Sequence, residues 1–118
     1  MFEYRREQQG AVTVLALRGN LDALTAPELR REIDTLVAER RSPVVLDLSG
    51  LELVDSSGVG SIVSLLKRMR MLTPPGEVKI ADLRGQPLQI FQLLRLHRAF
   101  DICPTVADAV ARLARGAG

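Results

Sequence analysis

The stretch VVLDLSGLELVDSSGVGSI, from Val44 to Ile62, decides the fold of this chain. Its first five residues form a near-continuous apolar run, which is typical of a strand covered on both faces in a parallel sheet. Ser49-Gly50 is expected to loosen the chain before a second apolar segment, Leu51–Val54. The polar residues Asp55–Gly58 then stand where an apolar helix begins at once. This succession of strand, tight polar joint and helix predicts a βα unit.

The residues after the joint continue the same alternation. The expected helix carries an apolar stripe at helical spacing, made of Val59, Ile62, Val63, Leu66 and Met69. Pro74-Pro75-Gly76 predicts a firm break after it. Beyond the break we expect a strand over Val78–Leu83, a third helix with Leu88, Phe91 and Leu94, a last strand at Ile102-Cys103, and a helix opening at Thr105 and ending at Gly116.

The residues before the stretch predict a β-hairpin and a first helix. Two alternating apolar segments flank Gln9-Gly10, where the hairpin turn is expected, and the second strand is expected to end at Leu17 or Leu21. The tetrad Thr25–Glu28 is typical of a capping box, in which the Thr25 hydroxyl accepts from the N–H of Glu28 and Glu28 reaches back. Pro43 is expected to stop this helix.

The predicted order β-β-α-β-α-β-α-β-α is that of an α/β protein. We expect one domain over residues 1–115, with a mixed, mostly parallel sheet of about five strands, an antiparallel edge strand and four helices. Residues 116–118 are expected to form a disordered tail. Because functional loops of such sheets gather at the C-terminal ends of the parallel strands, the Asp55–Gly58 joint falls on the functional edge.

Composition narrows the function classes. Aromatic residues make up only 3% of the 118 residues, so a surface that stacks single-stranded bases is not expected. The formal net charge is +2, and basic clusters such as Lys67–Arg70 are interpreted as solvated helix faces, with a nucleic-acid or lipid-surface patch as the alternative. The single cysteine, Cys103, is interpreted as a buried packing thiol. The N-terminus is polar and no apolar run is long enough for a membrane span, so we expect a soluble protein of the cytoplasm.

The Ser56-Ser57 pair allows several chemical interpretations. A nucleophile elbow needs glycines two residues before and after its serine, and Val54 and Asp55 stand at the preceding positions instead. A catalytic pair with the only histidine, His97, would depend on the fold bringing them together. The sequence contains no phosphate-binding loop motif and no cluster of metal ligands, so neither a cofactor nor a metal is expected.

Helix capping is the simplest interpretation of the joint. Asp55 or Ser56 suits the N-cap position, and Gly58 and Gly60 suit places of close packing. One helix start needs only one cap, however, and two glycines in the first turns of a helix cost about 1 kcal/mol each relative to alanine. Glycines at these positions would leave a flat, open surface around the two hydroxyls, which the active site of another protein could approach.

The chain resembles STAS domains, and among them the free-standing bacterial anti-sigma factor antagonists. The resemblance runs from Phe2 to Leu113 and rests on RGNLDALTAPELRREID (Arg18–Asp34), on VVLDLSGLELVDSSGVGSI, and on the βαβα order that follows. Many relatives carry a glycine where Arg95 stands, so a different helix end is expected there.

The resemblance implies a regulatory protein that is not an enzyme. In that family the domain binds an anti-sigma factor that is an ATP-binding serine kinase of histidine-kinase-like fold. The kinase phosphorylates the second serine of the DSSG motif, here Ser57, which releases the partners, and a serine phosphatase is a further expected partner. By the same resemblance the partner-binding residues are Asp22, Asp55, Ser56, Gly58, Val59 and Gly60.

Two alternatives remain open from the sequence. STAS-like domains also serve as scaffolds of stress-sensing assemblies and as accessory subunits of lipid transporters, without phosphorylation by such a kinase. The other alternative is ligand binding or hydrolysis at the same edge, which requires a pocket and requires His97 to lie within hydrogen-bond reach of a serine. The oligomeric state is not predicted.

Overall fold

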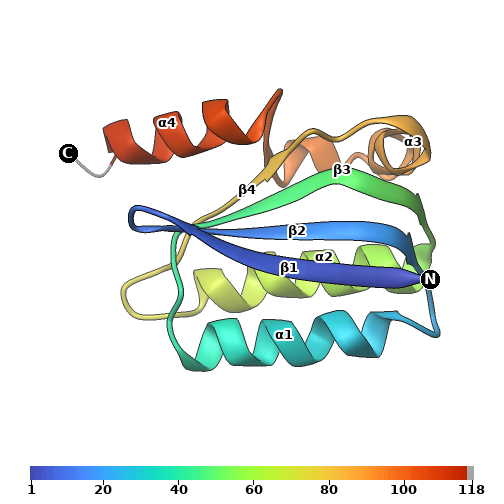
Figure 1. Ribbon diagram of the computed structural model, residues 1–118, viewed down its shortest axis with the longest axis horizontal. Coiled ribbons are helices and arrows are strands. Elements are labelled where there is room, and N and C mark those ends of the chain that lie inside the picture. Colours follow the sequence, from blue (N-terminus) through green and yellow to red (C-terminus); the bar gives the residue numbers. More distant parts are fainter. Residues whose placement is uncertain (117–118) are drawn as a thin grey trace.

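The computed structural model describes residues 1–116. The predicted element order is confirmed, with a short 3₁₀ helix, η1, added before the last strand (Figure 1). The elements are β1 (Phe2–Gln9), β2 (Val12–Leu21), α1 (Ala26–Ala38), β3 (Val44–Val54), α2 (Ser56–Arg70), β4 (Val78–Ala81), α3 (Gly85–Leu93), η1 (Leu96–Arg98), β5 (Asp101–Cys103) and α4 (Val106–Gly116). Of the predicted tail, Gly116 is the last residue of α4, and 117–118 lie outside the described residues.

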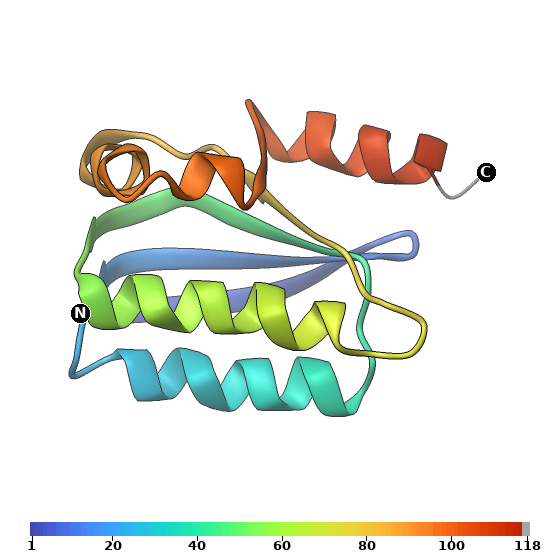
Figure 2. The same cartoon turned by 180° about the vertical axis from the view of Figure 1, so that it is seen from behind.

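The strands form one five-stranded sheet in the order β1-β2-β3-β4-β5. β1 pairs with β2 in antiparallel fashion, and every following pair is parallel, which confirms the predicted mixed sheet with an antiparallel edge strand. Helices α1 and α2 lie side by side on one face, and α4 lies on the other (Figures 1 and 2). α3 lies beside the C-terminal end of β3 (Figure 1).

The alternation of β2 divides the apolar side chains between the two faces. Leu15 and Leu17 belong to the larger core, which also contains the apolar stripes of α1 and α2. Val12 and Val14 belong to a smaller core that Ala109 and Leu113 of α4 complete, and this core also holds Cys103. Because both faces of the central strands are covered, these strands have the near-continuous apolar sequence seen in Val44–Leu48.

Some predicted boundaries are wrong. β3 runs unbroken from Val44 to Val54, so Ser49-Gly50 does not interrupt it. The pairing of β2 with β3 instead shifts register near these residues, and such irregularities bend a strand without ending it. The expected strand over Val78–Leu83 ends at Ala81. Gln9 is still part of β1, so the hairpin turn falls after it.

Arg95 stands just after α3, in the backbone conformation that a glycine would favour at a helix end. It adopts a left-handed backbone conformation with φ 58°, a region that glycine occupies far more readily. α3 ends before it, and η1 begins directly after it.

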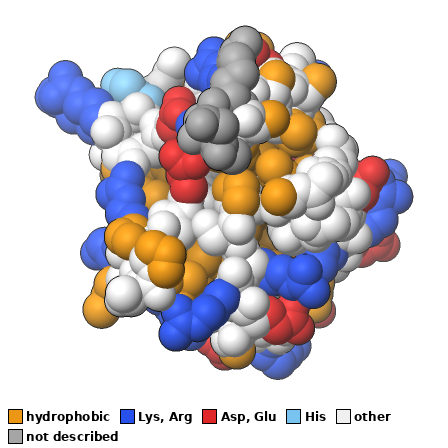
Figure 3. Space-filling model, turned by 90° about the vertical axis from the view of Figure 1, so that its left-hand side faces the viewer, with side chains coloured by type: hydrophobic (Ala, Val, Ile, Leu, Met, Phe, Trp, Pro, Cys, Tyr) orange, Lys and Arg blue, Asp and Glu red, His pale blue; other side chains and the backbone are white. Residues whose placement is uncertain are grey.

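Charged side chains pair across elements. Arg6 of β1 forms a bidentate pair with the buried Glu32 of α1, at 3.1 and 3.0 Å, and also contacts Glu39 at 2.9 Å. The carboxylate of Glu32 is the first cause of a raised Arg6 pKa. Figure 3 shows the end of the molecule with the hairpin turn, where basic, acidic and apolar side chains are interspersed. No helix in residues 1–116 has the length and hydropathy needed to span a bilayer.

Candidate functional site

The predicted site lies at one edge of the sheet, where β2 and β3 end and where α1 and α2 begin (Figure 1, right). Asp22 follows the last residue of β2, and Asp55 follows the last residue of β3. Ser57 is the second residue of α2. Neighbouring parallel strands thus bring together residues that are far apart in sequence.

Asp55 joins the two loops of this edge. It is the N-cap of α2, and its Oδ1 accepts a hydrogen bond from the N–H of Gly58 at 2.9 Å, which confirms one of the two predicted caps. Its Oδ2 accepts from the N–H of Ala23 at 3.2 Å, and its own N–H donates to the carbonyl of Leu21. One carboxylate therefore fixes the start of α2 to the loop between β2 and α1.

Asp22 organises the start of α1. Its Oδ1 accepts hydrogen bonds from the N–H of Leu24 at 2.9 Å and from the N–H of Thr25 at 3.1 Å, and it lies 3.2 Å from the Thr25 hydroxyl oxygen. The N–H of Thr25 is the largest cause that lowers the pKa of the Asp22 carboxyl, followed by the Thr25 hydroxyl and the N–H of Leu24. Asp22 therefore keeps its negative charge at pH values at which an ordinary aspartate begins to be protonated.

The predicted capping box is wrong. Thr25 precedes α1, but its side chain makes no capping hydrogen bond. The hydroxyl instead donates to the carbonyl of Asn20 at 2.8 Å and accepts from the N–H of Asp22 at 2.9 Å. The Thr25 hydroxyl therefore holds together the two sides of the loop that carries Asp22. Its hydrogen bonds go to backbone groups of this loop and not to the N–H groups of α1.

The two serines occupy the first turn of α2 with their hydroxyls uncommitted. Ser56 is exposed and Ser57 is half-buried. Within residues 1–116, neither hydroxyl makes a hydrogen bond, although the carbonyl of Ser57 accepts from the hydroxyl of Ser61 at 3.1 Å. The backbone N–H groups of a first turn have no partner inside their helix, so this turn favours an anion beside it. Ser57 can therefore be reached from outside and can hold an added negative charge.

The three residues after Ser57 differ in their exposure. Gly58 is buried, and a Cβ there would meet the carbonyl oxygen of Leu21 and would lie 2.6 Å from a methyl group of Val54. Val59 is 6% exposed and belongs to the larger core. Gly60 is exposed, and a Cβ there would meet nothing within 4 Å, so its expected role in close packing is wrong. Gly58 and Val59 thus shape the site from inside, and Gly60 faces outward.

Gln86 of α3 is a site residue that the sequence did not reveal. Its side-chain amide pairs with the backbone of Val54 as a strand would: Oε1 accepts from the N–H at 2.9 Å, and Nε2 donates to the carbonyl at 3.0 Å. Val54 is the last residue of β3, immediately before Asp55. A hollow of about 280 Å³ lies here, lined by Asn20, Leu21, Asp22, Leu53, Val54, Asp55 and Gln86.

His97 lies in η1 and is exposed. In the part of the chain that the structure describes, no hydrogen bond joins it to Ser56 or Ser57, so the geometry offers no catalytic pair. Cys103 is 1% exposed in the smaller core, and burial raises the pKa of its thiol. A buried, protonated thiol fits the predicted packing role.

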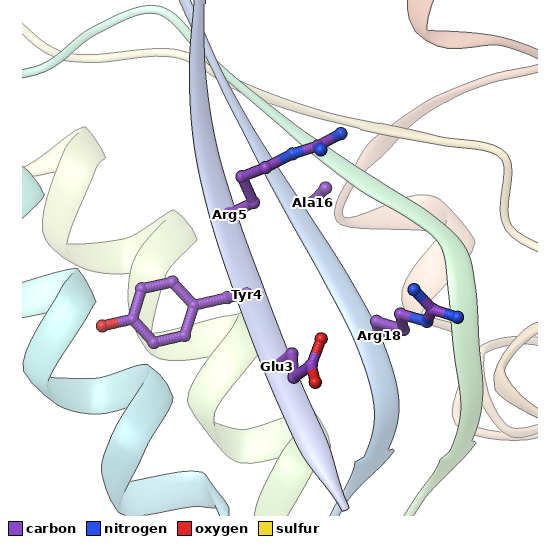
Figure 4. A pocket seen from close by; sticks show the side chains of 5 residues that line it. All are labelled: Glu3, Tyr4, Arg5, Ala16 and Arg18. Carbon is purple, nitrogen blue, oxygen red and sulfur yellow. The ribbon is translucent and has the colours of Figure 1, made fainter.

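A second hollow, of about 180 Å³, lies on β1 and β2 (Figure 4). Its lining residues are Glu3, Tyr4, Arg5, Ala16 and Arg18. Figure 4 shows Tyr4 pointing toward the side of α1 and α2, whereas the charged side chains point toward the opposite face of the sheet. None of these residues belongs to the Ser57 site.

Comparisons with known proteins bear on the whole chain. It matches the STAS domain family over residues 3–109. The anti-sigma-F factor antagonist RsfB of Mycobacterium tuberculosis is 27% identical over 105 residues, which cover 89% of this chain and 84% of that protein. The anti-sigma F factor antagonist of Paenibacillus polymyxa is 29% identical over 108 residues, which cover 91% of this chain and 88% of that protein.

A solved structure shows the same similarity to anti-sigma factor antagonists. The crystal structure of an anti-sigma factor antagonist from Mycobacterium paratuberculosis has a TM-score of 0.85 at 26% identity, and the match covers 95% of this chain and 93% of that chain. The order and direction of the strands and the family match over residues 3–109 lead to the same conclusion: this chain belongs to the STAS domain family.

Proposed function

We propose that this chain is an anti-sigma factor antagonist that switches partners through phosphorylation of Ser57. In its unphosphorylated form it captures an anti-sigma factor that is an ATP-binding serine kinase of histidine-kinase-like fold, and a sigma factor is thereby freed for transcription. Its curated relatives from Mycobacterium tuberculosis and Paenibacillus polymyxa carry the name of anti-sigma-F factor antagonists, which supports this class of function. The chain acts in the cytoplasm as a binding partner and a substrate, and not as an enzyme.

The observation that carries the proposal is the setting of the Ser57 hydroxyl. It is half-buried, it makes no hydrogen bond within residues 1–116, and it stands in the first turn of α2. In the proposed reaction its oxygen attacks the γ-phosphorus of ATP, ADP leaves, and a base of the kinase takes the hydroxyl proton. The phosphate that forms meets the free N–H groups of the helix start, so the chain itself tolerates it.

Phosphorylation of Ser57 would weaken binding of the kinase through the negative charge that it adds. A phosphoserine adds about −1.5 to −2 charges. Asp22 and Asp55 already present carboxylates to this edge, and Asp22 keeps its charge because backbone N–H groups lower its pKa. A kinase surface that accommodates a neutral hydroxyl at the same edge as two acids must then accept a third negative group. Repulsion and desolvation of a few kcal/mol weaken binding, by about tenfold for each 1.4 kcal/mol.

Intact-mass measurement tests the proposal. Each histidine-kinase-like serine kinase encoded in the source genome is purified and incubated with this chain and ATP. We expect the gain of one phosphate with one of these kinases and no gain for Ser57→Ala. Ser49→Ala, which changes an exposed serine outside the predicted partner-binding residues, is the matched control and should gain one phosphate like wild type. A mass that stays unchanged with every kinase of the panel, each shown to be active on another substrate, contradicts the proposed function.

A further inference from the structure

Gly60 stands where a helix gains nothing from glycine. It is the fifth residue of α2, it is exposed, and a Cβ built on it would meet nothing within 4 Å. At Gly58, by contrast, Leu21 and Val54 leave no room for a side chain. Glycine lowers helix stability relative to alanine because it loses more backbone freedom on folding. Folding therefore explains Gly58 and leaves Gly60 without a structural reason.

The place of Gly60 on the helix relates it to Ser57. Residues three apart on a helix are neighbours on its surface, so Gly60 lies one turn beyond Ser57 on the same side. A side chain on a helix leans toward the N-terminus and covers the surface over the preceding turn. Any side chain at position 60 would therefore lean over the turn that carries Ser56 and Ser57.

We infer that Gly60 is a clearance position, kept without a side chain so that the kinase can pack directly against the backbone of α2 while Ser57 is in its active site. This inference rests on the proposed function and gives Gly60, which the family resemblance names only as a partner-binding residue, a specific role in access to Ser57. The occupant of the cleared surface is the serine kinase itself. Gly60 takes no part in phosphoryl transfer, and it acts only by leaving room.

A size series at this position tests the inference. Gly60→Ala and Gly60→Leu are compared with wild type for thermal unfolding and for phosphorylation by the kinase identified in the panel above. We expect Gly60→Ala to raise the Tm by about 2–4 °C, because a helix interior gains an alanine. For the same variant we expect kcat/KM for phosphorylation to fall about tenfold, and for Gly60→Leu about a hundredfold, chiefly through a higher KM because docking is obstructed.

Ala38→Leu is the matched control. Ala38 is an exposed residue at the far end of α1, so the variant adds a side chain of the same kind on a helix surface away from Ser57. We expect it to be phosphorylated like wild type. Wild-type rates for both Gly60 variants, or equal losses for Ala38→Leu, overturn the clearance role and leave the proposed function intact. Failure of the wild-type chain to be phosphorylated by any kinase of the panel overturns both.

Discussion

Gly58 allows α2 to begin directly against the sheet. Its backbone passes so close to the carbonyl of Leu21 and to the side chain of Val54 that a Cβ cannot be placed without displacing one of them. Its N–H also donates to the Asp55 cap. One residue without a side chain thus holds the start of α2 in contact with the ends of β2 and β3.

We predict that Gly58→Ala destabilises the protein. The added methyl group overpacks a place bordered by backbone, which cannot move aside as a flexible side chain can, and we expect a loss of about 1–3 kcal/mol in the free energy of unfolding. Urea denaturation followed by circular dichroism measures this value. Gly60→Ala is the matched control and should not lose stability, so an equal loss in both variants would contradict the distinction between the two glycines.

The sequence alone predicts the structural role of some of these residues and not of others. Asp55 was predicted as a cap because an acid before an apolar helix is a local signal, and the structure confirms it. Thr25 carried an equally good local signal, yet its hydroxyl bonds to Asn20 and Asp22, because the loop folds back over it. The difference between Gly58 and Gly60 depends on β2 and β3 and is therefore invisible in the sequence of α2 alone.

At the scale of elements, α3 stabilises the site from the side. The two hydrogen bonds of Gln86 continue the pairing of β3 at Val54, where β4 has already ended. A single side chain thus replaces a strand neighbour for the residue before the Asp55 cap. Without it, the backbone N–H of the buried residue Val54 loses its partner, and such a loss costs about 1–3 kcal/mol.

We predict that Gln86→Ala lowers the free energy of unfolding by about 1–2 kcal/mol and increases amide hydrogen exchange at Val54 and Asp55 more than elsewhere. Gln92→Ala, an exposed change at the other end of α3, is the matched control and should have neither effect. Chemical denaturation and hydrogen exchange measured by NMR give both values. Unchanged exchange at Val54 in Gln86→Ala would show that the amide pairing does not hold the end of β3.

The order of elements was predictable, whereas some of their ends were not. The apolar pattern, periodic in the helices and in the hairpin and continuous in Val44–Leu48, indicated the elements because burial imposes it, and the mixed sheet followed from the alternation of strands and helices. Ser49-Gly50 was misread because a polar residue and a glycine are typical of a loop, but β3 keeps its pairing with β2 through register shifts. η1 is too short to leave a periodic signal, and the role of Gln86 depends on contact between distant segments.

At the scale of the whole molecule, the Ser57 site lies at one edge of a sheet that two apolar cores hold in place. The sheet separates two apolar cores, and α1, α2 and α4 cover its faces (Figures 1 and 2). Arg6 and Glu32 add a bond between the edge strand and α1. Ser57 lies at the rim of this frame and makes no side-chain hydrogen bond within residues 1–116 that a modification would break. We therefore expect the proposed phosphorylation of Ser57 to act on the partner without refolding the chain.

We predict that Ser57→Asp leaves the fold intact and weakens kinase binding. An acid in the first turn of α2 gains about 0.3–1 kcal/mol from the helix dipole, and repulsion by the nearby Asp22 and Asp55 offsets part of this, so the free energy of unfolding should change by less than about 1 kcal/mol. The Kd for the kinase, measured by calorimetry, should rise by about tenfold or more. Ser57→Asn, which has the same shape without the charge, should bind more tightly than Ser57→Asp. A large fall in stability for Ser57→Asp, or equal affinities of the two variants, would show that the switch works through structure or shape and not through charge.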